Sequence, residues 1–113
     1  MPFIHVRTTR EVSKQQEKSL AARFGSAMPV IGKSEEWLMV GLEEKCHLYF
    51  RGSDEQDLCF VTVAVFGKMD PAKADMLTEK ITAAIGEQLH IAPDCIYIQY
   101  QEASMWGWNG SNF

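Results

Sequence analysis

The feature that most constrains this chain is an internal repeat. The segments Phe3–Val6 and Phe60–Val63 have similar β-branched and aromatic content and begin 57 residues apart. Each one precedes a helix-start signal, a helical stretch and a second strand candidate. A strand, a helix and a strand in this order favour a right-handed crossover that pairs the two strands in parallel. The repeat therefore predicts two β-α-β units.

In the first unit, a helix is followed by an apolar strand. Thr8 and Glu11 have the spacing of a capping box, and apolar residues then recur on one face, which predicts a helix over 11–27. The apolar run Trp37–Val40 lies inside 36–43 and predicts a largely buried strand there.

The second unit carries clearer boundary signals. Residues 58–66 form a nearly continuous run of apolar residues and strand formers, which Gly67 interrupts. Asp70 and Pro71 are typical of an N-cap followed by proline at the first helical position. The alternating segment Cys95–Tyr100 completes the unit as a strand.

Together the two units predict an α/β fold, a two-layer sandwich of a four-stranded mixed sheet with both helices on one face. The 113 residues suit a single domain, predicted over 1–113. Several strands are apolar on both sides, so the second face of the sheet also needs a cover. Because this chain has no third layer left to supply, the pattern indicates an oligomer.

Composition excludes several classes of partner. Lys plus Arg is 11 and Asp plus Glu is 15, and no basic cluster occurs, so neither nucleic acid nor an anionic membrane is an expected partner. No apolar run approaches the roughly 20 residues of a membrane helix. The first residues alternate in polarity instead of forming a secretory signal, so the predicted location is cytoplasmic.

The metal-binding residue types show no ligand spacing. Three cysteines, an odd number without C-x-x-C spacing, predict buried free thiols; they are Cys46, Cys59 and Cys95. The histidines are equally scattered along the chain, so no metal or cofactor is expected.

Several short motifs carry a family resemblance. In chain order they are Pro2 before a strand, Gly32-Lys33 ahead of Trp37, Phe50 with Gly52-Ser53, Phe66-Gly67-Lys68, Ile91-x-Pro93-Asp94-x-x-Tyr97-Ile98-x-Tyr100, and Gly107-Trp108-Asn109-x-Ser111. Over essentially the whole chain this set resembles the macrophage migration inhibitory factor family of the tautomerase superfamily. The resemblance implies a doubled β-α-β fold assembled as a homotrimer, with active sites at the subunit interfaces.

The resemblance also implies a catalytic pair. Pro2 would act as an acid–base through its amino-terminal nitrogen, which requires that Met1 be removed, because an amide nitrogen is not a base. A free α-amino group titrates at about 7.7–8.0, and burial or a nearby cation lowers that value, so the neutral amine can accept a proton near neutral pH. Lys33 would hold a substrate carboxylate and supply that cation.

Six further residues would bind the substrate by the same resemblance. Tyr97 would come from the adjacent subunit, and Trp37 from the neighbouring chain. Gln99 stands where vertebrate members often have asparagine, and Trp106 replaces a smaller aliphatic residue. The full set is Phe3, Trp37, Phe66, Tyr97, Gln99 and Trp106.

The expected activity is keto–enol tautomerisation of an aromatic α-keto acid such as phenylpyruvate. One alternative is a cytokine-like signalling or interaction protein with a weak or vestigial site and a receptor as its partner. Family members can leave cells without a signal peptide, so the resemblance leaves an extracellular role open.

Hydration or dehalogenation of a small unsaturated acid is a third possible function, but the arginines lie in no motif for it. Gln56 stands where the family's thiol motif has its first cysteine, so no thiol oxidoreductase is expected.

Overall fold

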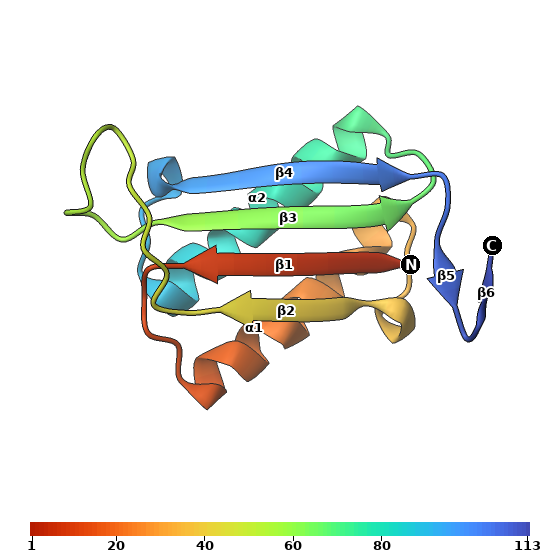
Figure 1. Cartoon of the computed structure of the whole chain (residues 1–113), viewed down its shortest axis with the longest axis horizontal. Coiled ribbons are helices and arrows are strands. Elements are labelled where there is room, and N and C mark those ends of the chain that lie inside the picture. The colour runs from red at the N-terminus through yellow and green to blue at the C-terminus, as the bar shows by residue number, and fades with distance from the viewer.

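The computed structural model describes residues 1–113 and is a two-layer α/β sandwich (Figure 1). In chain order its strands and helices, with 3-10 turns written η, are β1 (Pro2–Thr8), α1 (Lys14–Ala27), η1 (Met28–Ile31), η2 (Glu35–Trp37), β2 (Met39–Glu43), β3 (Cys59–Phe66), α2 (Pro71–Leu89), η3 (Pro93–Cys95), β4 (Ile96–Ala103), β5 (Gly107–Trp108) and β6 (Ser111–Asn112).

The topology of the sheet confirms the predicted repeat. The strand order is β2-β1-β3-β4. The two strands of each unit are parallel, β1 with β2 and β3 with β4, while the units meet through the antiparallel pair β1 and β3. The result is the predicted mixed four-stranded sheet, with both helices on one of its faces (Figure 1).

The core lies between the sheet and the two helices. Burial alternates along β1, so that Ile4 and Val6 are buried against the helices while their neighbours face the other way. Phe24 of α1 and Ile81 of α2 are buried opposite them, as the apolar faces of the helices require. The opposite face of the sheet is not covered by any element of this chain (Figure 1).

The predicted capping of α1 by Thr8 was wrong. Thr8 lies at the end of β1, where its hydroxyl donates to the carbonyl of Leu58 at 2.9 Å. Ser13 caps the helix instead: its hydroxyl accepts from the backbone of Gln16 at 3.1 Å, and the Gln16 side chain accepts from the backbone of Ser13 at 2.9 Å. The helix consequently begins three residues later than predicted, at Lys14.

The strand predicted over 36–43 was also partly wrong. It begins at Met39, because Glu35–Trp37 form a 3-10 turn, and it is half-exposed because it lies at an edge of the sheet. The prediction for α2 was correct: Asp70 accepts from the backbone of Ala72 at 3.2 Å as its N-cap.

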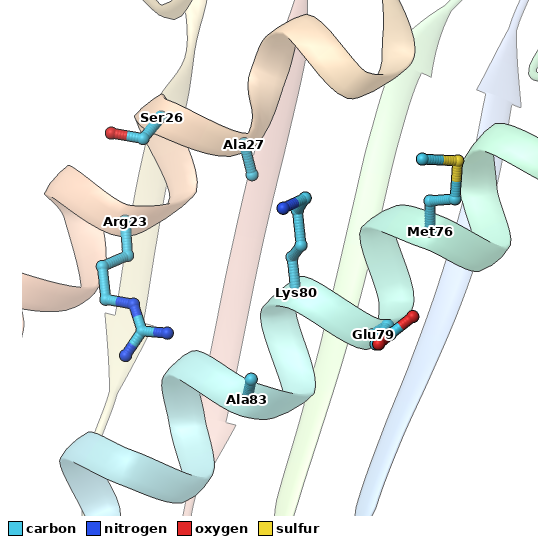
Figure 2. A pocket seen from close by; sticks show the side chains of 7 residues that line it. All are labelled: Arg23, Ser26, Ala27, Met76, Glu79, Lys80 and Ala83. Carbon is cyan, nitrogen blue, oxygen red and sulfur yellow. The ribbon is translucent and has the colours of Figure 1, made fainter.

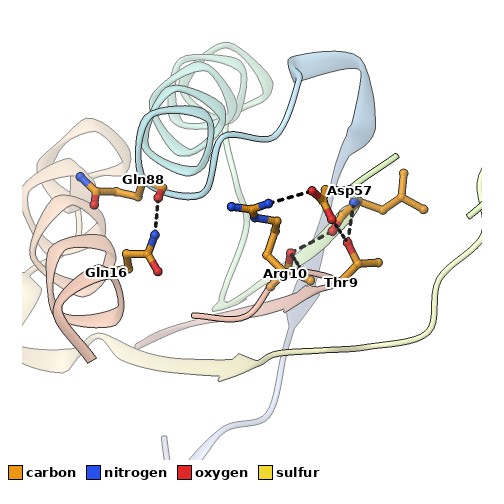
Figure 3. Close-up of polar contacts among 7 residues, drawn as sticks. Thr9, Arg10, Gln16, Asp57 and Gln88 are labelled. Carbon is orange, nitrogen blue, oxygen red and sulfur yellow. Dashed lines mark hydrogen bonds and ion pairs between the residues drawn. The ribbon is translucent and has the colours of Figure 1, made fainter. Parts of the chain in front are cut away.

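Polar contacts tie the two units together at the end of the sheet where β1 finishes (Figure 3). Asp57 accepts from the hydroxyl of Thr9 and from the guanidinium of Arg10, each at 3.1 Å. The backbone of Leu58 donates to the Thr9 hydroxyl at 2.9 Å. These contacts fix the start of β3 against the end of β1.

Cys59 and Cys95 are buried free thiols, as predicted, but Cys46 is only half-buried. No helix is both long and apolar enough to pass through a bilayer. No group of three or more histidine, cysteine, aspartate or glutamate side chains is placed to hold a metal ion.

Candidate active site

Pro2 opens the first strand of the sheet. It pairs across from Val65 of β3, is buried, and shares the helix-facing side of β1 with Ile4. A proline is tolerated here because the first residue of a strand does not need to donate to the ladder. The Pro2 nitrogen therefore lies at the very start of the strand, where it is bonded to Met1.

Met1 occupies the space next to that nitrogen. Its carbonyl accepts from the backbone N–H of Phe66 at 3.2 Å. Burial, followed by the charge of Lys33, lowers the pKa of the Met1 amino group below its ordinary value. The amino end of the chain thus lies in an environment that favours a neutral amine, close to a backbone donor and a cation.

Lys33 reaches this end of the sheet from the turn after α1. Gly32 adopts a left-handed conformation, with φ of 70°, and closes the 3-10 turn η1. The backbone of Lys33 then donates to the carbonyl of Met28 at 3.1 Å, which fixes the direction of the chain. The Lys33 ammonium donates to the carbonyl of Phe66 at 3.3 Å, so Lys33 and Phe66 meet beside Pro2.

Four aromatic side chains pack together at the same end of the molecule. The rings of Trp37 and Trp108 meet edge to face at 5.0 Å, and those of Phe66 and Phe113 at 5.4 Å. Trp108 and Phe113 lie 6.5 Å apart, so the four rings form one continuous group. Trp37 therefore lies at the Pro2 end of its own chain.

A terminal hairpin delivers two of these rings. It consists of β5 and β6, which pair in an antiparallel manner, and it lies beside the amino end of β1 (Figure 1). Its turn residues Asn109 and Gly110 both have positive φ, as a type I′ turn requires. The backbone of Phe113 donates to the carbonyl of Trp106 at 3.0 Å, which anchors the last residue to the chain before β5.

Trp108 and Phe113 were not among the predicted binding residues. The Gly-Trp-Asn-x-Ser motif carried the signal for Trp108, but a hairpin of two-residue strands has too little periodicity to predict. The aromatic content of the tail indicated that Phe113 packs on the domain or on a neighbour, but its place beside Phe66 depends on that hairpin and could not be predicted.

The remaining predicted residues lie elsewhere on the sheet. Tyr97 pairs with Phe60 on β3, whereas Pro2 pairs with Val65. Those two β3 positions are five residues apart, which corresponds to about 17 Å along a strand. One chain therefore brings Pro2, Lys33 and Phe66 together, but it leaves Tyr97 at the opposite end.

Gln99 and Phe3 lie on the uncovered face. Gln99 pairs with Thr62, partway between the two ends of the sheet. Phe3 stacks on His5, with ring centroids 5.4 Å apart. Trp106, half-buried, precedes β5 and contributes its carbonyl to the hairpin anchor.

A separate hollow of about 520 Å³ lies between the outer sides of α1 and α2 (Figure 2). Figure 2 shows Lys80 of α2 extending between the two helices, with Arg23 and Ser26 on α1 and Glu79 on α2. It contains none of the residues around Pro2, and the charged side chains that line it, Arg23, Glu79 and Lys80, do not converge on one point. The hollow is therefore not the candidate site.

A doubled β-α-β unit that begins with proline and places a lysine beside it defines the class of this protein as the tautomerase superfamily. The sequence matches the family described as macrophage migration inhibitory factor over residues 1–113. The chain belongs to that family.

Individual relatives agree in length and fold. The macrophage migration inhibitory factor of Rattus norvegicus is 28% identical over 116 residues, covering 100% of this chain and 99% of the relative. The crystal structure of Leishmania major MIF2 superposes with a TM-score of 0.94 at 32% identity, covering 100% of this chain and 97% of that one. A homologue from Prochlorococcus marinus gives a TM-score of 0.88 at 27% identity, covering 98% of both chains.

Proposed function

We propose that this protein is a keto–enol tautomerase that acts on aromatic α-keto acids such as phenylpyruvate, with the amino-terminal nitrogen of Pro2 as the acid–base. The observation that carries the proposal is the geometry at the amino end of β1, where the Lys33 ammonium donates to the Phe66 carbonyl at 3.3 Å and the Phe66 N–H donates to the Met1 carbonyl at 3.2 Å. Burial and the charge of Lys33 also lower the pKa of the Met1 amino group there. After removal of Met1 the secondary amine of Pro2 would become the amino terminus at this end of β1, and we expect Lys33 to lower its pKa as well. A base that is neutral near neutral pH is what proton transfer at carbon needs.

Removal of Met1 also frees a hydrogen-bond donor. The Phe66 N–H that now donates to the Met1 carbonyl at 3.2 Å would lose its partner. The Met1 carbonyl oxygen thus stands in for an oxygen of the substrate. A keto acid placed there offers a carboxylate to the Lys33 ammonium and an oxygen to the Phe66 N–H, both within reach of the Pro2 nitrogen.

The proton balance of the reaction needs no further reactant. The Pro2 nitrogen takes a proton from the carbon beside the ketone, and the C–H electron pair becomes the carbon–carbon double bond of the enol. The protonated amine then gives that proton to the enolate oxygen and is neutral again. In the reverse direction the protonated amine returns its proton to carbon. The rings of Trp37, Trp108 and Phe113 line this end of the molecule and suit an aryl substituent.

The proposed site is completed by a second copy of the chain. Tyr97 is 57% exposed, and in one chain it lies far from Pro2 along the sheet. The uncovered sheet face supports association of copies, and the family is typically homotrimeric. In a trimer that joins the Tyr97 end of one chain to the Pro2 end of the next, Tyr97 and Gln99 would contact the substrate from the neighbour.

Enol–keto conversion of phenylpyruvate, followed by absorbance, tests the proposal. Mass spectrometry first establishes that Met1 is absent from the purified protein. A variant with alanine inserted between Met1 and Pro2 keeps the proline but leaves its nitrogen in an amide after Met1 is removed. We expect this variant to lose at least about 100-fold in kcat, the lower range for general-base catalysis.

Pro2→Gly is the matched variant, since it keeps a free amine of a different kind and should retain part of the rate. Both variants should keep the oligomeric state of the parent. Full turnover by the alanine-insertion variant would contradict the catalytic role of Pro2. Absence of turnover in a parent protein that lacks Met1 would instead favour the interaction role over the enzyme.

A further inference from the structure

The end of the sheet opposite Pro2 carries an aromatic cluster that the proposed chemistry has not explained. The ring of Tyr97 meets Phe50 edge to face, with centroids 5.1 Å apart and an interplanar angle of 75°. It meets Phe60 on another side at 6.4 Å and 88°. Tyr97 is the middle ring of the three, yet it is 57% exposed, so part of it remains free for contact.

Phe50 begins a tight hydrogen-bonded turn. Its backbone exchanges two hydrogen bonds with Ser53, at 2.9 Å and 3.1 Å. The two residues between them, Arg51 and Gly52, have φ of 55° and 75°. Positive φ at both central positions is the pattern of a type I′ turn, in which glycine relieves the strain at the second position. The turn therefore fixes the backbone from which the Phe50 side chain projects toward Tyr97.

The loop 50–56, which begins with this turn, contacts the residues before β4 at two places. The Arg51 guanidinium lies 4.8 Å from the centroid of the Phe50 ring and 3.6 Å from the carboxylate of Asp94. The side-chain oxygen of Gln56 accepts from the thiol of Cys95 at 2.9 Å. Because Asp94 and Cys95 immediately precede β4, these contacts fix the backbone that carries Tyr97.

On the Phe60 side, the cluster is bordered by the charged residues Arg7 and Glu43. Arg7 pairs in register with Glu43 on β2 and with Phe60 on β3, and its guanidinium lies 5.6 Å from the centroid of the Phe60 ring. Tyr97 is thus flanked by two phenylalanines, each of which is covered by a guanidinium. A side chain held from both sides loses little freedom when it meets a ligand.

We propose that Phe50 is a positioning residue: through Tyr97 it sets how tightly the site of the neighbouring subunit binds the aryl group of its substrate. This inference rests on the proposed function, in which Tyr97 reaches that site. Phe50 touches no substrate itself. The loop 50–56 of one chain thereby contributes to aryl binding at a site whose base belongs to another chain.

A double-mutant cycle between Phe50 and Tyr97 tests this, with phenylpyruvate as substrate. An aromatic pair contributes about 0.5–1.5 kcal/mol, which corresponds to about a two- to twelvefold loss for Phe50→Ala. We expect this loss in kcat/KM, mainly through KM, and expect it to disappear when Tyr97→Ala is already present. Phe50→Tyr, which retains a ring, should restore most of the lost affinity.

Tyr49→Ala is the matched control, since Tyr49 is the exposed neighbour of Phe50 and forms no ring pair with Tyr97. Its kcat/KM should stay near that of the parent. If Phe50→Ala folds and assembles normally but its loss is the same with and without Tyr97, the positioning role is wrong. If Tyr97→Ala itself retains full kcat/KM while the alanine insertion before Pro2 abolishes turnover, the inference fails and the base assignment stands.

Discussion

At the scale of single residues, Lys33 serves both substrate binding and the lowered pKa of the base in the proposed chemistry. Its ammonium is tied to the Phe66 carbonyl at 3.3 Å, and its charge contributes to the lowered pKa of the amino terminus. Both effects come from one position because Gly32 turns the chain toward the end of β1. A substitution at Lys33 should therefore alter substrate binding and the titration of the base together.

We predict that Lys33→Gln lowers kcat/KM about 10- to 100-fold, the loss expected when a hydrogen bond to a charged group is removed. The cation also disfavours protonation of the nearby amine, so its removal raises the pKa of that amine. The active form of the base is neutral, and the rate rises as the pH passes that pKa. The acid limb of the profile of kcat/KM against pH should therefore move to higher pH.

Lys68→Gln provides the control for this profile. Lys68 is a nearly fully exposed lysine that pairs with Glu102 on the surface at 3.7 Å. Its removal takes the same formal charge from the protein without touching Phe66. An equal shift of the acid limb in both variants would contradict a local effect of Lys33 and indicate a general effect of net charge.

The buried thiols give a second prediction at this scale. Burial raises the pKa of Cys59 to about 12, so the thiol stays neutral at pH 8. We expect an alkylating reagent at pH 8 to modify half-buried Cys46 first and to leave Cys59 unmodified in the folded protein. Peptide mass spectrometry at successive times measures the order. In urea the three cysteines should react alike, and rapid labelling of Cys59 in the folded state would contradict its burial.

At the scale of elements, the start of α1 depends on the reciprocal contacts between Ser13 and Gln16. We predict that Ser13→Ala lowers the free energy of unfolding by about 1 kcal/mol, the usual effect of removing an N-cap. Urea denaturation should show a lower midpoint with an unchanged slope.

Ser26→Ala is the control for this helix, because Ser26 is exposed near its carboxyl end and makes no cap contact. It should leave the stability unchanged or raise it slightly, as alanine favours helix. A loss as large as that of Ser13→Ala would mean that helix composition, and not the cap, sets the stability.

The elements that were predictable are those whose signals are local. Asp70 and Pro71 specify the start of α2 by their own chemistry, and the apolar run of β3 specifies a central strand. Thr8 has the same type of hydroxyl as Ser13, but its bond to Leu58, which lies 50 residues away, decides its role. A distant partner of that kind cannot be recognised from the spacing of neighbouring residues.

The residues of the candidate site also divide into those with a local sequence signal and those whose position depends on distant partners. Pro2 and Lys33 could be named from motifs close to them in the chain, and the structure brings them to one end of the sheet. Phe113 could not, because its position depends on the β5–β6 hairpin. The position of Tyr97 follows from strand register, which requires the topology of the whole sheet before its distance from Pro2 can be estimated.

At the scale of the whole molecule, the antiparallel junction of β1 and β3 sets the two halves of the proposed site at opposite ends. The first unit brings Pro2 to one end, while the second unit presents Tyr97 at the other. In the proposed assembly, the Tyr97 end of one chain contacts the Pro2 end of the next. Each site then contains Pro2 of one subunit and Tyr97 of its neighbour. Closed rotational symmetry then completes every site in the ring.

Mixing two defective variants tests this arrangement. The alanine insertion before Pro2 removes the free base but keeps Tyr97, and Tyr97→Ala has the opposite defect. If each site combines Pro2 of one chain with Tyr97 of the next, random co-assembly in equal amounts makes about a quarter of the sites native. We therefore predict that the native sites of the co-expressed pair contribute about a quarter of the parental kcat/KM, in addition to the residual activity of sites that lack only Tyr97. If both residues of a site come from the same chain, no mixture can make a native site, and the rate should equal the average of the two variants. Separately purified variants, mixed without an unfolding step, serve as the control because their subunits have not exchanged.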